Sequence, residues 1–139
     1  MSLLSVFDIA GSGMSAQSLR LNMTASNMAN ADSVSSSFNQ TYRGRHPVFE
    51  TIMDEFRFDA EARPGGVRVA AVVESDAPLR TEYRPDHPLA DEDGYVYLPN
   101  VNLMEEMANM IAASRSYQSN VEVANASKQM LLSTLRLGQ

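Results

Sequence analysis

The sequence contains no cysteine, and it has no long apolar run. Without cysteine, disulfides, thiolate catalysis and cysteine metal sites are all excluded. No apolar run approaches the about 20 residues of a membrane span, and the first basic residue is Arg20. The sequence therefore predicts neither membrane insertion nor secretion by an ordinary signal peptide, so export from the cytoplasm would need another route.

Positive charge is also scarce. The chain has 11 Lys and Arg against 17 Asp and Glu, which gives a net charge of −6. Phosphate binding needs clustered Lys and Arg, so this balance argues against nucleic acid as a partner. Residues 33–102 hold 12 of the acidic and 7 of the basic side chains. The middle of the chain is therefore acidic, and both ends are nearly neutral.

The last third of the chain, residues 102–139, predicts a long helix with almost no charged face. Asn102 is a suitable N-cap with Glu105 three residues on, and Gly138 is a natural stop. At about 1.5 Å per residue the helix would span roughly 50 Å, more than one small core can cover. Apolar, small or occasionally charged residues recur at steps of four and three, which keeps one seam on one side: Leu103, Met107, Met110, Ser114, Tyr117, Val121, Ala124, Lys128, Leu131 and Leu135.

The first segment, residues 1–32, predicts a second helix of the same kind. Its seam consists of residues seven apart, namely Phe7, Met14, Leu21 and Met28. Either Ser5 or Ser12 is expected to begin the helix. The glycines at positions 11 and 13 favour the later start or a close approach of another backbone. Two uncharged helices at opposite ends of one chain are expected to pair as an antiparallel coiled-coil-like hairpin.

The middle, residues 33–101, predicts a linker followed by a small, mostly β lobe with long loops. Residues 31–40 have loop composition, and a short strand is expected around residues 48–52, limited by Gly44 and Pro47. The strongest strand pattern, residues 67–74, follows a turn signal at residues 64–66. Residues 77–83 and 95–99 are further extended candidates, so the predicted fold class is α+β.

Catalytic and ligand-binding motifs are not found in the sequence. His46 and His87 each stand alone before a proline, without a second histidine at metal-binding spacing. An EF-hand alignment on Gly94 puts Leu89 and Asn100 where carboxylates are needed. No phosphate-binding glycine loop and no nucleophile elbow occurs. We therefore expect no enzymatic activity, no cofactor, no metal and no small-molecule substrate.

Two terminal motifs carry a resemblance to a known family. Residues 9–17, IAGSGMSAQ, with the later segments 21–22 and 25–31, resemble the N-terminal signature of bacterial flagellar rod, hook and filament-junction axial proteins. Residues 99–107 and 113–120, with the final LRLGQ, resemble their C-terminal signature. The short middle, including residues 66–69, 85–88 and 94–96, is similar to that of a proximal-rod component.

The resemblance implies a structural subunit of the basal-body proximal rod, the torque-transmitting drive shaft that spans the periplasm. It implies polymerisation through the terminal helices, with the middle lobe outside, and type III export without a cleaved signal peptide. The implied partners are other copies of the chain, other rod proteins, the flagellar export apparatus and the MS-ring region. The expected assembly residues are Phe7, Met14, Leu21, Asn22, Asn27, Met28, Asn30, Met107, Met110, Tyr117, Val121 and Leu131.

Three alternatives stay open on sequence alone. A free coiled-coil adaptor that binds a partner through the middle lobe predicts a discrete oligomer with folded ends. A small hydrolase or metal protein predicts activity that depends on His46 or His87. Within the family, another proximal-rod paralogue differs only in the middle lobe.

Overall fold

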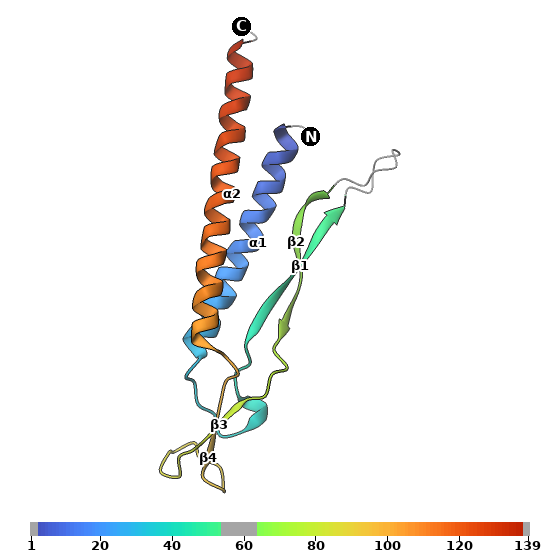
Figure 1. Cartoon of the computed structure of the whole chain (residues 1–139). Helices are drawn as coiled ribbons and strands as arrows, with labels where there is room; N and C mark the ends of the chain where they lie inside the picture. Colours follow the sequence, from blue (N-terminus) through green and yellow to red (C-terminus); the bar gives the residue numbers. More distant parts are fainter. Residues whose placement is uncertain (1–2, 54–63, 138–139) are drawn as a thin grey trace.

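The computed structural model describes residues 3–53 and 64–137 and has an α+β fold, as the sequence predicts. Two long helices run antiparallel, and two small antiparallel sheets lie between them in sequence (Figure 1). Among the described residues, no helix is long and apolar enough to cross a membrane. The elements in chain order are α1 (Leu3–Asn30), a 3-10 helix (Phe38–Gln40), β1 (Arg45–Met53), β2 (Pro64–Glu74), β3 (Arg80–Tyr83), β4 (Tyr95–Leu98) and α2 (Leu103–Leu137).

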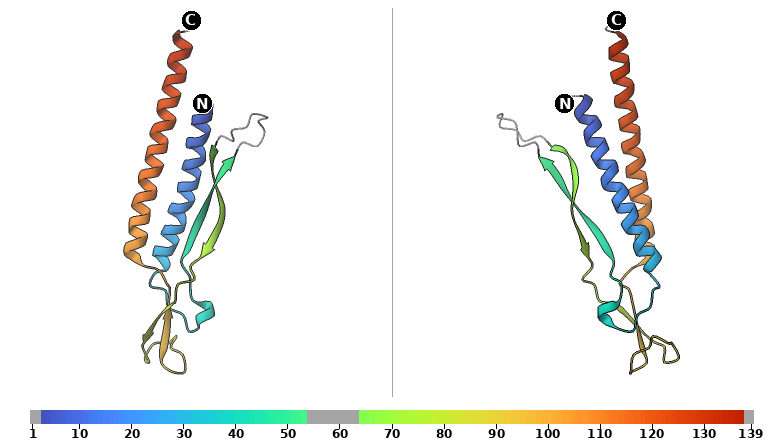
Figure 2. Two further views of the ribbon diagram at one scale, coloured as in Figure 1. Left: turned by 45° about the vertical axis from the view of Figure 1, so that its right-hand side comes forward. Right: turned by 180° about the vertical axis from the view of Figure 1, so that it is seen from behind.

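The two helices lie side by side, and α2 extends beyond the N-terminal end of α1 (Figures 1 and 2). Their lengths follow from 28 and 35 residues, which at about 1.5 Å each give about 42 Å and 52 Å. The close approach expected at the glycines occurs at Gly13, where an added Cβ would lie 2.8 Å from Asn120 Nδ2. The neighbour is a side chain of α2 and not a backbone. Gly11 has open space around it.

The start of α1 differs from both expectations, because the helix begins at Leu3, before Ser5 and Ser12. Ser12 lies inside the helix, where its Oγ donates to the Ile9 carbonyl at 2.7 Å and accepts from the Val67 N–H of β2 at 3.1 Å. A residue suited to capping is used here to join a helix to a strand. The expected stop at Gly138 lies outside the described residues.

The cap of α2 is confirmed. Asn102 Oδ1 accepts hydrogen bonds from the N–H groups of Met104 at 3.1 Å and Glu105 at 3.5 Å. These are two of the four donors that a helix N-terminus leaves without an intrahelical partner. Asn102 therefore fixes the point at which the chain turns back along α1.

The β1–β2 ribbon packs along α1 and is longer than predicted. The short strand expected near residues 48–52 runs nine residues through Pro47, which pairs with Val72. In a two-stranded sheet every strand is an edge, so proline is tolerated there. The expected turn at residues 64–66 is wrong, because these residues begin β2. Gly66 has φ +142°, and an added Cβ would lie 2.6 Å from Ser12 Oγ, so this glycine permits contact with α1.

The β3–β4 sheet lies beyond the helices, at the end of the molecule away from both termini (Figure 1). Its register pairs Arg80 with Leu98 and Tyr83 with Tyr95. The segment expected to be a linker contributes to it, because Ser35 forms a bridge with Tyr97. The middle of the chain is thus divided between a ribbon beside the helices and a sheet at one tip.

Two asparagines hold these parts together where the helices, the ribbon and the tip meet. Asn27 is fully buried; its Nδ2 donates to the Arg45 carbonyl, and its Oδ1 accepts from Tyr42 O–H and Arg45 N–H, all at 2.9 Å. Asn100 Oδ1 accepts from Gly44 N–H at 2.9 Å, and its Nδ2 donates to the carbonyls of residues 75 and 77. Because each amide joins segments distant in sequence, the two side chains fix the geometry of the junction.

Candidate assembly surface

Apart from Glu106, the buried residues of α2 are small. Ala113 is fully buried, Ser127 is 1% exposed and Ala124 is 8% exposed. Ala10 of α1 is similarly buried, and Gly13 meets Asn120 at close range. Small side chains let two helices approach closely, but they bury little apolar area.

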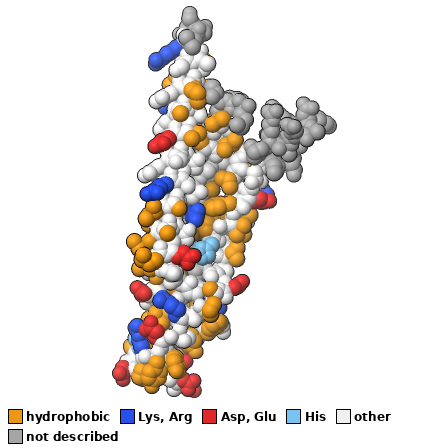
Figure 3. All heavy atoms as spheres, viewed as in Figure 1, with side chains coloured by type: hydrophobic (Ala, Val, Ile, Leu, Met, Phe, Trp, Pro, Cys, Tyr) orange, Lys and Arg blue, Asp and Glu red, His pale blue; other side chains and the backbone are white. Residues whose placement is uncertain are grey.

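The exposed side of α2, in contrast, carries the large apolar side chains. Met104 is 75% exposed, and Leu135 is 68% exposed. Figure 3 shows hydrophobic side chains gathered over the lower half of this helix. A helix of an ordinary soluble monomer has the opposite arrangement, with its large apolar residues toward the core. Among the residues of α2 whose burial the structure describes, the large apolar residues that are exposed are Leu103, Met104, Met107, Ile111, Tyr117, Val123, Met130, Leu132 and Leu135.

The residues predicted for assembly fall into three groups. Exposed are Phe7, Asn22, Met107 and Tyr117. Partly buried, at the border between seam and surface, are Met14, Leu21, Met28, Met110, Val121 and Leu131. The two remaining residues, Asn27 and Asn30, are bonded within the chain.

Asn27 departs from the expectation of an inter-subunit contact. Its side chain is buried and makes the three internal hydrogen bonds of the junction, so it is not available at the surface. Asn30 is partly buried, and its Nδ2 donates to the Ser26 carbonyl of the same helix at 2.8 Å. We therefore assign Asn27 to the fold, whereas Asn22 lies exposed on α1.

Sequence reasoning missed several exposed apolar residues of α2 because it followed a single seam. Met104, Met107 and Ile111 are spaced by three and four residues, so they form a second stripe on the helix. Met107 belongs to both patterns. A search for a second apolar stripe would have found this surface, and two stripes on one helix indicate neighbours on two sides.

In the described part of the chain, no three acidic or histidine side chains gather closely enough to hold a metal ion. His46 Nδ1 lies 3.9 Å from Glu106 Oε1. Glu106 is only 4% exposed, and its Oε2 has no hydrogen-bond partner. His87 Nδ1 accepts from Leu89 N–H at 3.1 Å in its own turn. The two histidines therefore lie in separate environments.

One phenol in the tip has a perturbed acidity. Tyr97 O–H donates to Asp91 Oδ2 at 3.2 Å. This hydrogen bond, together with the negative charge of Asp91, raises the pKa of Tyr97 above its usual value. Asp91 Oδ1 also accepts from the backbone N–H groups of Asp93 and Tyr95. The Asp91 carboxylate thus stabilises the turn before β4, so its role is structural.

The ends and the full length of the chain match known proteins. Residues 7–35 match the family described as Flagella basal body rod protein, and residues 92–137 match Flagellar basal body rod FlgEFG protein C-terminal. The chain is 53% identical to the flagellar basal-body rod protein FlgC of Yersinia enterocolitica and 52% identical to that of Salmonella typhimurium. Each comparison covers the whole of both chains. The chain belongs to the FlgC family.

Membership of the FlgC family confirms the resemblance that the terminal motifs carry. The FlgC protein of Buchnera aphidicola from Acyrthosiphon pisum is 40% identical, again over the whole of both chains. The two family matches fall mainly on α1 and α2, the elements that carry the exposed apolar surface. The chain is therefore a flagellar basal-body rod protein with a structural role in motility.

Proposed function

We propose that this chain polymerises through the outer faces of α1 and α2 into the proximal rod, the shaft that transmits motor torque. The observation that carries the proposal is the inverted burial of α2. Small residues such as Ala113 are buried, whereas Met104 and Ile111 are 75% and 53% exposed. Burial against a neighbour would stabilise the assembly by about 25 cal/mol for each Å² of apolar surface removed from water.

The proposal implies a contact between unlike surfaces, in which the exposed apolar stripe of α2 on one copy packs against a different surface of the next copy. Contacts between unlike surfaces that do not close a ring build helical filaments. Knobs-into-holes packing along long helices would then fix the register between neighbours and supply stiffness. In this proposal the chain acts mechanically and catalyses no reaction.

The proposal extends to location and partners. We expect the chain to contact other copies, other rod proteins and the MS-ring region, and to leave the cytoplasm through the flagellar export apparatus without a cleaved signal peptide. The ends of the helices away from the junction at Asn27 and Asn100 are expected to be poorly ordered before assembly, because a pair joined through small residues buries too little apolar area to offset the ordering entropy there.

The experiment compares two charged substitutions on the exposed side of α2. Ile111→Asp places a carboxylate in the proposed contact, and Ser119→Asp adds the same charge at an exposed polar position about 80° round the helix from Ile111. We expect Ile111→Asp to abolish rod assembly and swimming, because an unpaired buried charge is strongly unfavourable. Ser119→Asp should swim normally. Normal swimming of the Ile111→Asp strain would contradict the proposal.

The concentration dependence of association distinguishes a free coiled-coil adaptor from a rod subunit. We expect the purified chain to sediment as a monomer at low concentration and to gain helical circular dichroism as it associates. A fully helical oligomer of one size at every concentration would favour the adaptor instead.

A further inference from the structure

The β3–β4 sheet has one buried face and one open face. Val96 is fully buried and Leu98 is 4% exposed, whereas Tyr95 is 44% exposed. Successive side chains of a strand point to opposite faces, so Tyr95 and Tyr97 share the face away from Val96. Tyr83 pairs with Tyr95 across the sheet and is 65% exposed. The open face of this sheet is therefore aromatic.

Two contacting pairs of rings lie on this face, and we call the four rings together the aromatic tip: Phe38 with Tyr97, and Tyr83 with Tyr95. The rings of Tyr83 and Tyr95 meet edge to face with centroids 5.3 Å apart, and Phe38 meets Tyr97 at 6.5 Å. The chain has only ten aromatic side chains, so four at one end is a marked concentration. Aromatic side chains are enriched at recognition surfaces, because they bury a large area at low entropic cost.

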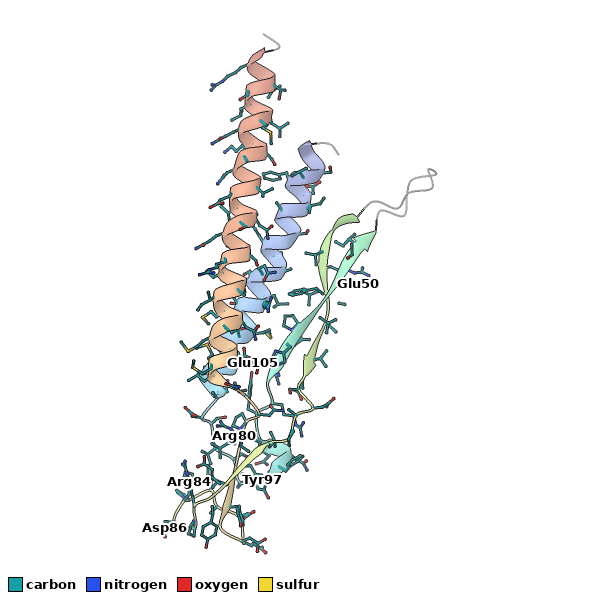
Figure 4. The ribbon with its side chains drawn as sticks, viewed as in Figure 1. Glu50, Arg80, Arg84, Asp86, Tyr97 and Glu105 are labelled. Carbon is teal, nitrogen blue, oxygen red and sulfur yellow. The ribbon has the colours of Figure 1, made fainter. Side chains whose placement is uncertain are left out.

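The rim of the aromatic tip is acidic. Residues 82–93 contain five acidic side chains and one basic side chain, Arg84, which pairs with Glu82. Asp91 is bonded within its turn. Asp86 and the neighbouring pair at positions 92 and 93 are exposed, and within the described part of the chain they form no ion pair. Figure 3 shows acidic side chains on both sides of a hydrophobic cluster at this end, and Figure 4 places Arg84 and Asp86 there.

The chemistry of the aromatic tip favours a cation. The face of an aromatic ring carries partial negative charge and attracts guanidinium and ammonium groups. The carboxylates of the rim attract the same cationic groups. The chain contains an example of such a contact, because Arg43 Cζ lies 5.2 Å over the ring of Phe38. Among the described residues, no arginine or lysine lies over the rings of Tyr83 or Tyr95.

We propose that the aromatic tip binds an arginine- or lysine-rich segment of another protein. Cationic side chains of that segment stack on Tyr83 and Tyr95, and the exposed carboxylates of Asp86, Glu92 and Asp93 pair with them. The tip lies at the opposite end of the molecule from the termini (Figure 1). This contact is separate from the helix surface proposed for assembly and does not rest on it.

A second copy of the chain is a poorer match for the aromatic tip. The cations of the described part that form no ion pair or hydrogen bond to another group are Arg115, Lys128 and Arg136. They are separated along α2 by 13 and 8 residues, which corresponds to about 20 Å and 12 Å. Such wide spacing offers no cluster that could cover adjacent rings and carboxylates together.

The test uses the full chain and a hexa-arginine peptide as the probe, with binding mapped by amide NMR shifts. We expect shifts confined to residues 80–98 and a dissociation constant that rises at least tenfold on Tyr83→Ala, because the exposed ring supplies the stacking contact. Tyr83→Phe keeps the ring and should restore binding. Neutralisation of the rim by Asp86→Asn, Glu92→Gln and Asp93→Asn should weaken binding to a similar extent.

A matched control removes the same charge elsewhere, at the exposed acids Asp8, Asp32 and Glu122 changed to their amides. If the control weakens binding as much as the rim variant, or if the shifts spread over all acidic residues, attraction is not site-specific and the proposal is wrong. Shifts at the tip that depend on chain concentration without peptide would identify a second copy as the occupant and also overturn it. Unchanged amide shifts outside the tip show that each variant remains folded.

Discussion

At the scale of single residues, the buried polar groups have specific structural tasks. Asn27 satisfies three groups of the segment 42–45, and it lies on the last turn of α1. The amide offers a donor and an acceptor on one short side chain, so it can bind both the N–H and the carbonyl of Arg45. An alanine could not replace it without leaving those groups unpaired.

Asn27→Ala should lower the free energy of unfolding by about 3 kcal/mol, because it leaves buried donors and an acceptor without partners. Urea unfolding of the purified chain, followed by circular dichroism, measures the change. Asn22→Ala is the matched control, since Asn22 is exposed on the same helix and should change the stability by less than about 0.5 kcal/mol. If Asn27→Ala lowered the free energy of unfolding as little as Asn22→Ala does, the hydrogen bonds of Asn27 would contribute nothing to stability.

Glu106 is a second buried polar residue, but it is incompletely satisfied. Its Oε2 has no hydrogen-bond partner, and its Oε1 lies 3.9 Å from His46. A buried carboxylate without full pairing is costly. The sequence could not single it out, because Glu105 and Glu106 look equivalent at the start of a helix, and only the packing of α2 buries one of them.

At the scale of elements, the two glycines of α1 are in different environments that the sequence does not distinguish. Each costs about 1 kcal/mol relative to alanine in a helix interior. Gly11 has open space around its Cα, whereas an added Cβ at Gly13 would lie 2.8 Å from Asn120 Nδ2. Only the second glycine is required by the packing of the helix pair.

Gly11→Ala should therefore stabilise the chain by about 1 kcal/mol, and Gly13→Ala should give a smaller gain or a loss. The loss should be recovered when Gly13→Ala is combined with Asn120→Ala, which removes the obstructing amide. Thermal unfolding of the four variants, including Asn120→Ala alone, gives the coupling between the sites. Additive effects of Gly13→Ala and Asn120→Ala would contradict the close contact.

The long periodic elements could be predicted from the sequence, and the way the middle is arranged could not. Seven-residue spacing identified both helices, and Asn102 identified the start of α2. Local signals misplaced the start of α1 and the turn at residues 64–66, because Ser12 and Gly66 are used for a contact with each other. Such a contact joins residues more than 50 positions apart, so local propensity gives no indication of it.

The candidate surface was likewise predictable in part. The absence of charge around the helices indicated neighbours on several sides, whereas the identity of the buried face depended on the α1–α2 packing. Small residues such as Ala113 occupy it, and Ile111 is left exposed. The resemblance to axial proteins pointed to assembly through the helices, and it gave no indication of the aromatic tip.

At the scale of the whole molecule, the unequal lengths of the helices leave the end of α2 without a partner among residues 3–53 and 64–137, which the structure describes. Figure 2 shows this end standing clear of α1 in both views. Leu132 is 47% exposed and Leu135 is 68% exposed there. Exposed leucines on an unsupported helix end are unfavourable in a monomer, so we expect a neighbouring subunit to cover them.

The double variant Leu132→Asp, Leu135→Asp should therefore prevent assembly and swimming while it leaves the helicity of the free chain unchanged, because these side chains contribute little to the monomer. The control Gln129→Asp, Ser133→Asp adds the same charge at exposed polar positions of the same turns. Motility on soft agar and circular dichroism of the purified chains measure the two effects. If both variants lose motility equally, added charge is the cause and the leucines have no specific contact. If both swim, the end of α2 lies outside every interface of the rod, and the contacts that hold neighbouring subunits are confined to the part of α2 that α1 accompanies.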